Sequence, residues 1–187
     1  LMNTQPWSRF GALLLALAAG SAHCAETGVS DNEILVGQFA AQTGPAAELG
    51  KRMQLGILAH FNAVNAAGGI KALGGAKIEA VLGDAQSTPE GGNAEVEKMN
   101  SAGVAAVVGG YASSICLTAS QTAARYDLPY VVDVGVADNI MTRGLKNTFR
   151  FGPGFGVIAK TALDNLVTIN DQAGQPAKTV MIVHEDS

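Results

Sequence analysis

The sequence predicts an α/β protein built on a doubly wound parallel sheet. From residue 32 onward, short β-branched apolar runs alternate with amphipathic stretches, which is typical of strands wound with helices. The chain has 187 residues, of which 23 are glycine and only 5% are aromatic, and this composition suits a soluble α/β protein with many tight turns. The length is sufficient for one complete domain and part of a second.

The first predicted unit is a strand over residues 33–40 followed by a long helix. A turn at residues 42–45 opens this helix, which runs to about residue 66 and is ended by Gly68 and Gly69. Its apolar residues recur every three or four positions, as an amphipathic helix requires. They are Leu49, Met53, Ile57, Phe61 and Val64.

The same alternation continues through the next hundred or so residues. The predicted elements are a strand at 77–83, a helix at 89–102, a strand at 104–108, a helix at 116–126 and a strand at 130–134. Parallel strands joined through helices have right-handed crossovers almost without exception. The order βαβαβαβ therefore predicts an open sheet with helices on both faces.

Three more elements are predicted after residue 146. They are an extended segment at 147–151, a helix at 155–169 and a strand at 178–184. The sequence stops at Ser187 with no helix to cover the last strand, and Leu1 precedes Met2. We therefore expect the chain to be a fragment of a longer open reading frame.

Residues 1–25 have the features of an export signal. Arg9 supplies a positive charge, residues 11–19 form a short apolar run, and small residues precede Glu26. An apolar run of this length is too short to span a bilayer as a helix. We expect the mature chain to be located in the periplasm.

The cleavage site and the cysteines remain open at this point. Cleavage fits the sequence after Ala22 or after Cys24, whereas lipoprotein anchoring at Cys24 fits poorly because His23 precedes it and Ser21 stands at −3. Disulfides are common in exported proteins. The sequence has only two cysteines, Cys24 and Cys116, so at most one pair could form. We therefore expect the hydrophobic core, rather than disulfides, to hold the fold.

The sequence argues against nucleic-acid binding and against an enzyme. The net charge is −4, so no Lys/Arg stripe is available to neutralise phosphates. The motifs GxSxG, GxxxxGK[ST], GxGxxG and HExxH do not occur, and His23, His60 and His184 are scattered. Cys116 is predicted at a helix N-terminus, where a packed thiol and an activated nucleophile are the two alternatives. No cofactor and no metal are expected.

Three loops are predicted to form a binding site. Ligands of open α/β sheets lie beyond the carboxyl ends of the strands, which selects residues 40–49, 109–114 and 134–139. Ser113 and Ser114 lie just before a predicted helix, where hydroxyls and unpaired backbone N–H groups can bind a carboxylate. The alternative is that one of these serines only caps the helix.

Four short motifs occur together in the chain. They are Thr43-Gly44-Pro45, Asn65-Ala66-Ala67-Gly68-Gly69-Ile70, residues 81–89 (VLGDAQSTP), and residues 107–110 (VVGG) followed by Ser113-Ser114. Over residues 33–187 the sequence resembles the type I periplasmic solute-binding proteins of the leucine/isoleucine/valine-binding group. The resemblance implies a type I periplasmic-binding-protein fold, in which two lobes close on a small molecule and deliver it to an inner-membrane ABC permease. A ligand-sensing domain of a receptor or regulator with the same fold is the alternative.

The resemblance also implies which residues contact the ligand. They are Leu49, Tyr111, Ser113, Ser114, Gly135, Val136 and Ala137. Ser114 matches the serine that holds an α-carboxylate, Leu49 matches a position that is often aromatic, and the last three match the loop that receives an α-ammonium group. Ala137 replaces a threonine of that loop and has no hydroxyl. Asp133 and Asp138 are alternative acceptors for a cationic or amide group, or else turn caps.

The resemblance divides the chain into four parts. They are a signal peptide at 1–25, an N-terminal ligand-binding lobe at 26–146, a first hinge crossing at 147–153 and the start of a C-terminal lobe at 154–187. The remaining ligand contacts of the family come from the second lobe. Branched-chain amino acids, short amides and aromatic carboxylates therefore all stay open as ligands.

Overall fold

Five parallel strands form one sheet in the order β2-β1-β3-β4-β5. The computed structural model describes residues 26–183. The strands are β1 (Glu33–Ala40), β2 (Lys77–Asp84), β3 (Ala106–Gly109), β4 (Tyr130–Val132) and β5 (Thr148–Arg150). Every neighbouring pair is parallel. The predicted α/β class with a doubly wound parallel sheet is confirmed.

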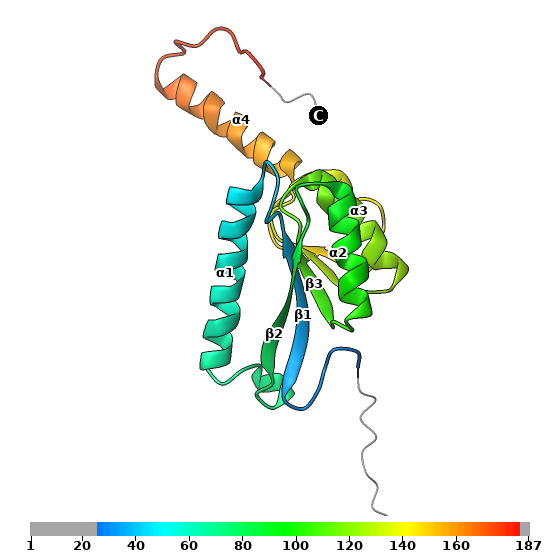
Figure 1. The fold of residues 1–187 in the computed structure, drawn as a ribbon. Helices are drawn as coiled ribbons and strands as arrows, with labels where there is room; N and C mark the ends of the chain where they lie inside the picture. The colour runs from blue at the N-terminus through cyan, green and yellow to red at the C-terminus, as the bar shows by residue number, and fades with distance from the viewer. Residues whose placement is uncertain (1–25, 184–187) are drawn as a thin grey trace, which may run out of the picture.

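Helices cover both faces of this sheet (Figure 1). They are α1 (Ala47–Ala66), α2 (Pro89–Ser101), α3 (Ser113–Arg125) and α4 (Phe155–Gln172), with short 3-10 turns η1 (Lys71–Leu73) and η2 (Asp138–Ile140). Helix α1 lies on one face and α2 and α3 lie together on the other, whereas α4 points away from the edge of the sheet (Figure 1). Thr88 caps α2 by accepting a hydrogen bond from the Gly91 N–H at 3.0 Å, and Pro89 follows at the first helical position.

The hydrophobic core lies between the sheet and the α2–α3 pair. Its largest fully buried apolar side chains include Phe39, Met99, Val107, Ile115 and Tyr130. The rings of Phe39 and Tyr130 stack with their centroids 6.0 Å apart, which joins β1 to β4 across β3. Alternate residues of each strand point to this face, so the core fixes the register of the sheet.

The opposite face of the sheet is only partly covered. Helix α1 packs over β1 and β2, and Gly50 is its one buried residue. Beyond α1 lies a groove of about 500 Å³ with an apolar floor that includes Val108 and Val131. His60 of α1 is exposed at the border of this groove, because α1 covers only the β1–β2 half of the sheet.

The strand predicted over residues 178–184 is not observed in residues 178–183. This segment has no regular secondary structure, and Val180, Met181, Ile182 and Val183 are each at least 75% exposed. An extended segment becomes a strand only when a neighbour pairs with its backbone, and within residues 26–183 none lies beside it. The prediction was wrong for these residues, and His184 lies outside the described part of the chain.

Several boundaries also differ from the predicted ones. Helix α3 begins at Ser113 rather than Cys116, and β3 begins at Ala106 rather than Val104. Strand β4 ends at Val132 rather than Val134, because the Val134 N–H turns back to the Asp133 carboxylate at 2.8 Å. The first difference changes the environment of the serines at the candidate site.

The predicted signal segment lies outside the described residues, and so does Cys24. Across residues 26–183, every helix lacks an apolar run long enough to cross a bilayer. The boundaries predicted between the two lobes and the hinge crossing stay a prediction.

Candidate ligand-binding edge of the sheet

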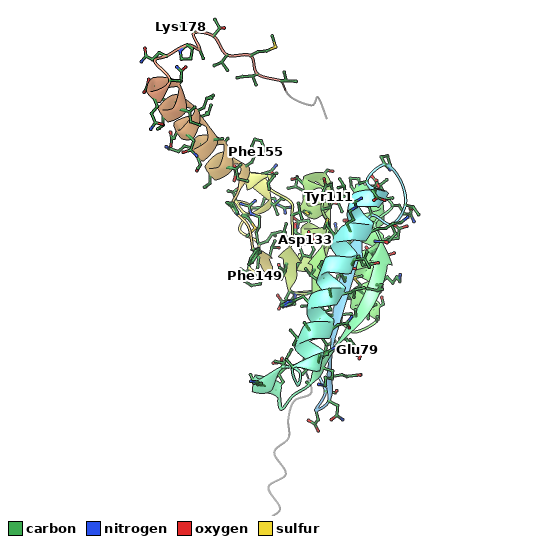
Figure 2. The ribbon with its side chains drawn as sticks, turned by 90° about the vertical axis from the view of Figure 1, so that its left-hand side faces the viewer. Glu79, Tyr111, Asp133, Phe149, Phe155 and Lys178 are labelled. Carbon is green, nitrogen blue, oxygen red and sulfur yellow. The ribbon has the colours of Figure 1, made fainter. Side chains whose placement is uncertain are left out.

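The loops after β1, β3 and β4 meet at one edge of the sheet, because parallel strands end on the same side. Figure 2 shows Tyr111 and Asp133 at this edge, with Phe155 at the first turn of α4 nearby. Glu79, the third residue of β2, lies well below them in the same view. The three loops selected from the sequence are therefore brought together.

The carboxylate of Asp84 fixes the loop after β1. One of its oxygens, Oδ1, accepts hydrogen bonds from the backbone N–H groups of Gln42 at 2.7 Å, Thr43 at 3.2 Å and Gln86 at 2.8 Å. The other, Oδ2, accepts from the Thr43 hydroxyl at 2.7 Å. Burial raises the pKa of Asp84, but these hydrogen bonds outweigh burial and leave the pKa below its usual value of 3.8.

Ser87 makes a second connection to the same loop. Its hydroxyl donates to the Thr43 carbonyl at 2.8 Å and accepts from the Ala46 N–H at 3.0 Å. Gly44 has a φ of +83° and packs so closely that a Cβ there would lie 2.7 Å from the Ser87 Oγ. Two motifs noted in the sequence, at 43–45 and at 81–89, are thus the two halves of one hydrogen-bonded structure.

Leu49 lies in the first turn of α1, and 47% of the residue is exposed. The next residue, Gly50, packs directly against the Ala41 carbonyl oxygen, so the start of α1 lies against the end of β1. This places Leu49 at the same edge as the other candidate residues and leaves its side chain open to a ligand.

The loop after β3 has an unusual backbone. Three successive residues have positive φ angles: +143° for Gly109, +114° for Gly110 and +44° for Tyr111. A Cβ at Gly110 would lie 2.6 Å from both the Cys116 Sγ and the Tyr130 Oη, so only glycine fits. Tyr111 is held in its left-handed conformation while its N–H donates to Asp133 Oδ1 at 3.4 Å. Strained backbone of this kind clusters at ligand-binding loops.

Ser113 and Ser114 are the first two residues of α3, and neither caps the helix with its side chain. The Ser113 hydroxyl accepts a hydrogen bond from the Ala137 N–H at 3.2 Å, which ties α3 to the loop after β4. Ser114 is exposed, and within residues 26–183 its hydroxyl has no hydrogen-bond partner. The unbonded hydroxyl and the first N–H groups of α3 are hydrogen-bond donors of the kind that an anion accepts.

In the loop after β4, two carbonyl groups are already hydrogen-bonded. The Val136 carbonyl accepts from the Phe155 N–H at 2.7 Å, and the Ala137 carbonyl accepts from the Arg150 guanidinium at 3.0 Å. Gly135 is buried and packs on the Cys116 sulfur, because a Cβ there would lie 2.7 Å from Sγ. In the described part of the chain, the Gly135 carbonyl is the one of the three that accepts no hydrogen bond.

The structure distinguishes the two aspartates that the sequence left open. Asp138 Oδ2 accepts a hydrogen bond from the Gly156 N–H at 2.8 Å, so Asp138 is engaged with α4. Asp133 Oδ1 accepts from the N–H groups of Val134 and Tyr111, whereas its buried Oδ2 has no partner within residues 26–183. Burial raises the pKa of Asp133. Asp133 therefore joins two of the loops.

Cys116 lies beneath the loops as part of their floor. Its thiol is buried under Gly110 and Gly135, and burial raises its pKa to about 11. Of the two alternatives from the sequence, the buried environment favours the packed thiol, since a nucleophilic cysteine needs a lowered pKa and access to solvent.

We expect Cys116 of the native protein to resist alkylation by iodoacetamide at pH 8, and to be alkylated fully once urea unfolds the chain. At pH 8 a thiol with a pKa of about 11 is almost entirely protonated, and burial also blocks the reagent. Mass spectrometry of the peptide that contains Cys116 measures the modification. Rapid labelling of the folded protein would contradict the buried-thiol assignment.

Comparison with known proteins gives a consistent result. The family described as "Periplasmic binding protein" matches residues 33–187. The "Leu/Ile/Val-binding protein homolog 8" of Brucella abortus is 32% identical over 158 residues, which are 83% of this chain and 38% of that protein. The chain thus spans about two fifths of the length of this relative.

Solved structures agree with the sequence relatives. One is the branched-chain amino acid transporter substrate-binding protein of Streptococcus pneumoniae in complex with isoleucine, with a TM-score of 0.61 and 26% identity over 66% of this chain and 34% of that one. Another is a solute-binding protein of an ABC transporter from Rhodopseudomonas palustris in complex with 3,4-dihydroxybenzoic acid. It has a TM-score of 0.59 and 21% identity over 73% of this chain and 37% of that one, a likeness that shows the fold alone.

Proposed function

The chain belongs to the periplasmic binding protein family, and from this membership we propose that it acts in the substrate-binding component of an ABC importer. The component captures a small carboxylate-bearing molecule, such as a branched-chain amino acid, and carries out no chemistry on it. Its location is the periplasm and its partner is an inner-membrane permease. The lobe at residues 26–146 supplies one side of the binding site, and the chain from residue 154 onward begins the other.

The observation that carries this proposal is the free donor site at the N-terminus of α3. Ser114 is exposed and its hydroxyl is unbonded among the described residues, whereas the neighbouring Ser113 is already engaged with Ala137. The first N–H groups of a helix lack intrahelical acceptors and carry partial positive charge. A carboxylate placed there gains hydrogen bonds from both the backbone and the Ser114 hydroxyl.

The acceptor side of the site supports an amine-bearing ligand. The Gly135 carbonyl accepts no hydrogen bond from the described residues and lies in the loop that Ser113 ties to α3. The Streptococcus pneumoniae protein of the same fold binds isoleucine, which has a carboxylate for the donor site and an ammonium group for such an acceptor. Ala137 supplies no hydroxyl to this group, so the second lobe must provide its remaining partners.

The test is Ser114→Ala in the longest product that the gene encodes, without residues 1–25. Loss of one hydrogen bond to a charged group costs about 1.5–3 kcal/mol, so affinity should fall roughly tenfold to hundredfold. Isothermal titration with L-isoleucine, L-leucine, a short amide and 3,4-dihydroxybenzoate measures the effect and identifies the ligand class.

Ser101→Ala is the matched control. This exposed serine is the last residue of α2, and the chain next enters the amino-terminal end of β3, so Ser101 lies on the side of the sheet away from the candidate site. The control should bind as the wild type does. A ligand whose affinity is the same for wild type and Ser114→Ala would contradict the assigned carboxylate site. Failure of every compound to bind would contradict the proposed function for this panel.

A further inference from the structure

The loop after β4 is bonded directly to the first turn of α4. The Phe155 N–H donates to the Val136 carbonyl at 2.7 Å, and the Gly156 N–H donates to Asp138 Oδ2 at 2.8 Å. These are the first two N–H groups of α4, which have no acceptor within the helix. Residues 136–138 therefore supply the cap that α4 does not find in its own N-cap residue, Gly154.

Arg150 fastens the same loop to β5. Its side chain is only 11% exposed, and its guanidinium donates to the Ala137 carbonyl at 3.0 Å and lies 3.8 Å from Asp138 Oδ1. Arg150 is the last residue of β5, just before the segment that leads into α4. The Asp138–Arg150 pair thus contacts the chain on both sides of residues 151–153.

The segment entering α4 fits tightly over this pair. A Cβ at Gly154 would collide with the Asp138 carboxylate and the Arg150 guanidinium, and a Cβ at Gly156 would lie 2.9 Å from Asp138 Oδ2. Figure 2 shows Phe155, which lies between these glycines, at the same edge of the sheet as Tyr111 and Asp133. The start of α4 is therefore held at the candidate binding edge.

Among residues 26–183, α4 is held at the sheet edge through its N-terminus and not through a packed core. Within residues 26–183, none of the side chains of α4 is buried, and Phe155, Val157 and Leu163 are each more than half exposed. The hydrogen bonds to residues 136–138 are the ones that join the N-terminus of α4 to the sheet edge.

The opposite side of the same loop contacts the proposed carboxylate site. The Ala137 N–H donates to the Ser113 hydroxyl at 3.2 Å, and Ser113 precedes Ser114 in the first turn of α3. One peptide segment thus connects the first turn of α3 with the first turn of α4. A displacement of residues 135–137 on ligand binding would be passed to α4 through Asp138 and Arg150.

We propose that Asp138 and Arg150 are positioning residues that couple ligand occupancy of the loop 135–137 to the orientation of α4, where the second lobe begins. The inference rests on the proposed function. It assigns Asp138 a task different from that of a ligand acceptor, because both of its oxygens already face α4 and Arg150. If the proposal holds, closure of the two lobes depends on Asp138, although Asp138 does not touch the ligand.

The experiment compares Asp138→Ala and Asp138→Asn with the wild type in the longest encoded product without residues 1–25. L-isoleucine and the other compounds of the panel above are the probes. Three quantities are measured: the affinity by titration calorimetry, the decrease in radius of gyration on ligand addition by small-angle X-ray scattering, and the melting temperature without ligand. The asparagine oxygen can still accept from the Gly156 N–H but cannot form an ion pair with Arg150.

Asp138→Ala is expected to weaken binding about tenfold, the factor that corresponds to one helix-capping hydrogen bond, and to reduce the ligand-induced compaction. Asp138→Asn should restore part of both. Asp164→Ala is the matched control, since Asp164 forms an exposed pair with Lys160 at 2.6 Å on the same helix, away from the loop. This control should leave affinity and compaction unchanged.

Two results would overturn the inference while the proposed function stands. One is a wild-type affinity and compaction in Asp138→Ala. The other is a lowered melting temperature with unchanged affinity, which would make Asp138 a structural cap and nothing more. If the wild type binds none of the probes, the proposed function fails first, and the inference fails with it.

Discussion

Gly109→Ala is expected to lower the free energy of unfolding by about 3–5 kcal/mol, a large share of the stability of an ordinary domain. Gly109 ends β3 with a φ of +143°, a backbone conformation that residues with a Cβ rarely adopt. A Cβ at this position would also collide with the Phe39 carbonyl oxygen of the neighbouring strand β1. Neither strand can move away, because β1 and β3 lie in the centre of the sheet.

Urea unfolding followed by circular dichroism measures this effect, with Gly56→Ala as the control. Gly56 is in the interior of α1 and has open space where a Cβ would be. Alanine there should raise the midpoint slightly, since glycine in a helix costs roughly 0.5–1 kcal/mol relative to alanine. An unchanged midpoint for Gly109→Ala would show that the β1–β3 contact relaxes easily.

Asp84→Ala is expected to lower the free energy of unfolding by about 2 kcal/mol at pH 7. The variant loses several hydrogen bonds to a charged acceptor, and each contributes less than a buried one because solvent partly screens the carboxylate. The loop after β1 loses four hydrogen bonds, from three backbone N–H groups and the Thr43 hydroxyl. Because this loop borders the candidate site, we also expect weaker ligand binding.

The effect of Asp84→Ala should depend on pH in a defined direction. The pKa of Asp84 is lower in the folded chain than its usual value of 3.8, so the unfolded chain takes up the proton first as the pH falls. The stabilisation is therefore complete above about pH 4–5 and is lost as the pH falls through the lowered pKa. Unfolding measured at pH 7 and pH 3 should show a larger difference between wild type and variant at pH 7.

Asp31→Asn is the control for this experiment, because Asp31 is an exposed aspartate before β1. It should leave both the midpoint and its pH dependence close to the wild-type values. Equal destabilisation by Asp84→Ala at both pH values would mean that the hydrogen bonds, rather than the charge, carry the whole effect.

The sequence motifs identified the loops at the candidate site, but they did not identify the hydrogen-bond partner of each residue in those loops. Thr43 and Ser87 were noted in separate motifs, and the structure joins them through a hydrogen bond between residues 44 positions apart. Ser113 and Ser114 were both candidates for a carboxylate site, with helix capping by one of them as the alternative. In the structure neither serine caps α3, Ser113 is bonded to Ala137, and Ser114 is exposed. The ligand-binding roles of these residues stay a prediction.

The sequence by itself determined the α/β class, the succession of strands and helices and the set of loops at the candidate binding edge. These features follow from local periodicity, from glycine and proline positions and from the rule that parallel strands end on one side of a sheet. Each depends on residues that are close in the chain, so each could be predicted without the tertiary structure.

The tertiary structure alone decided the strand order, the partner of Asp138 and the absence of a strand in residues 178–183. It also decided that the Asp133 Oδ2 is buried without a partner among residues 26–183. The physical reason is common to all four. Each depends on which backbone or polar group from a distant segment comes within hydrogen-bonding distance, and no local pattern of residue types specifies that distance.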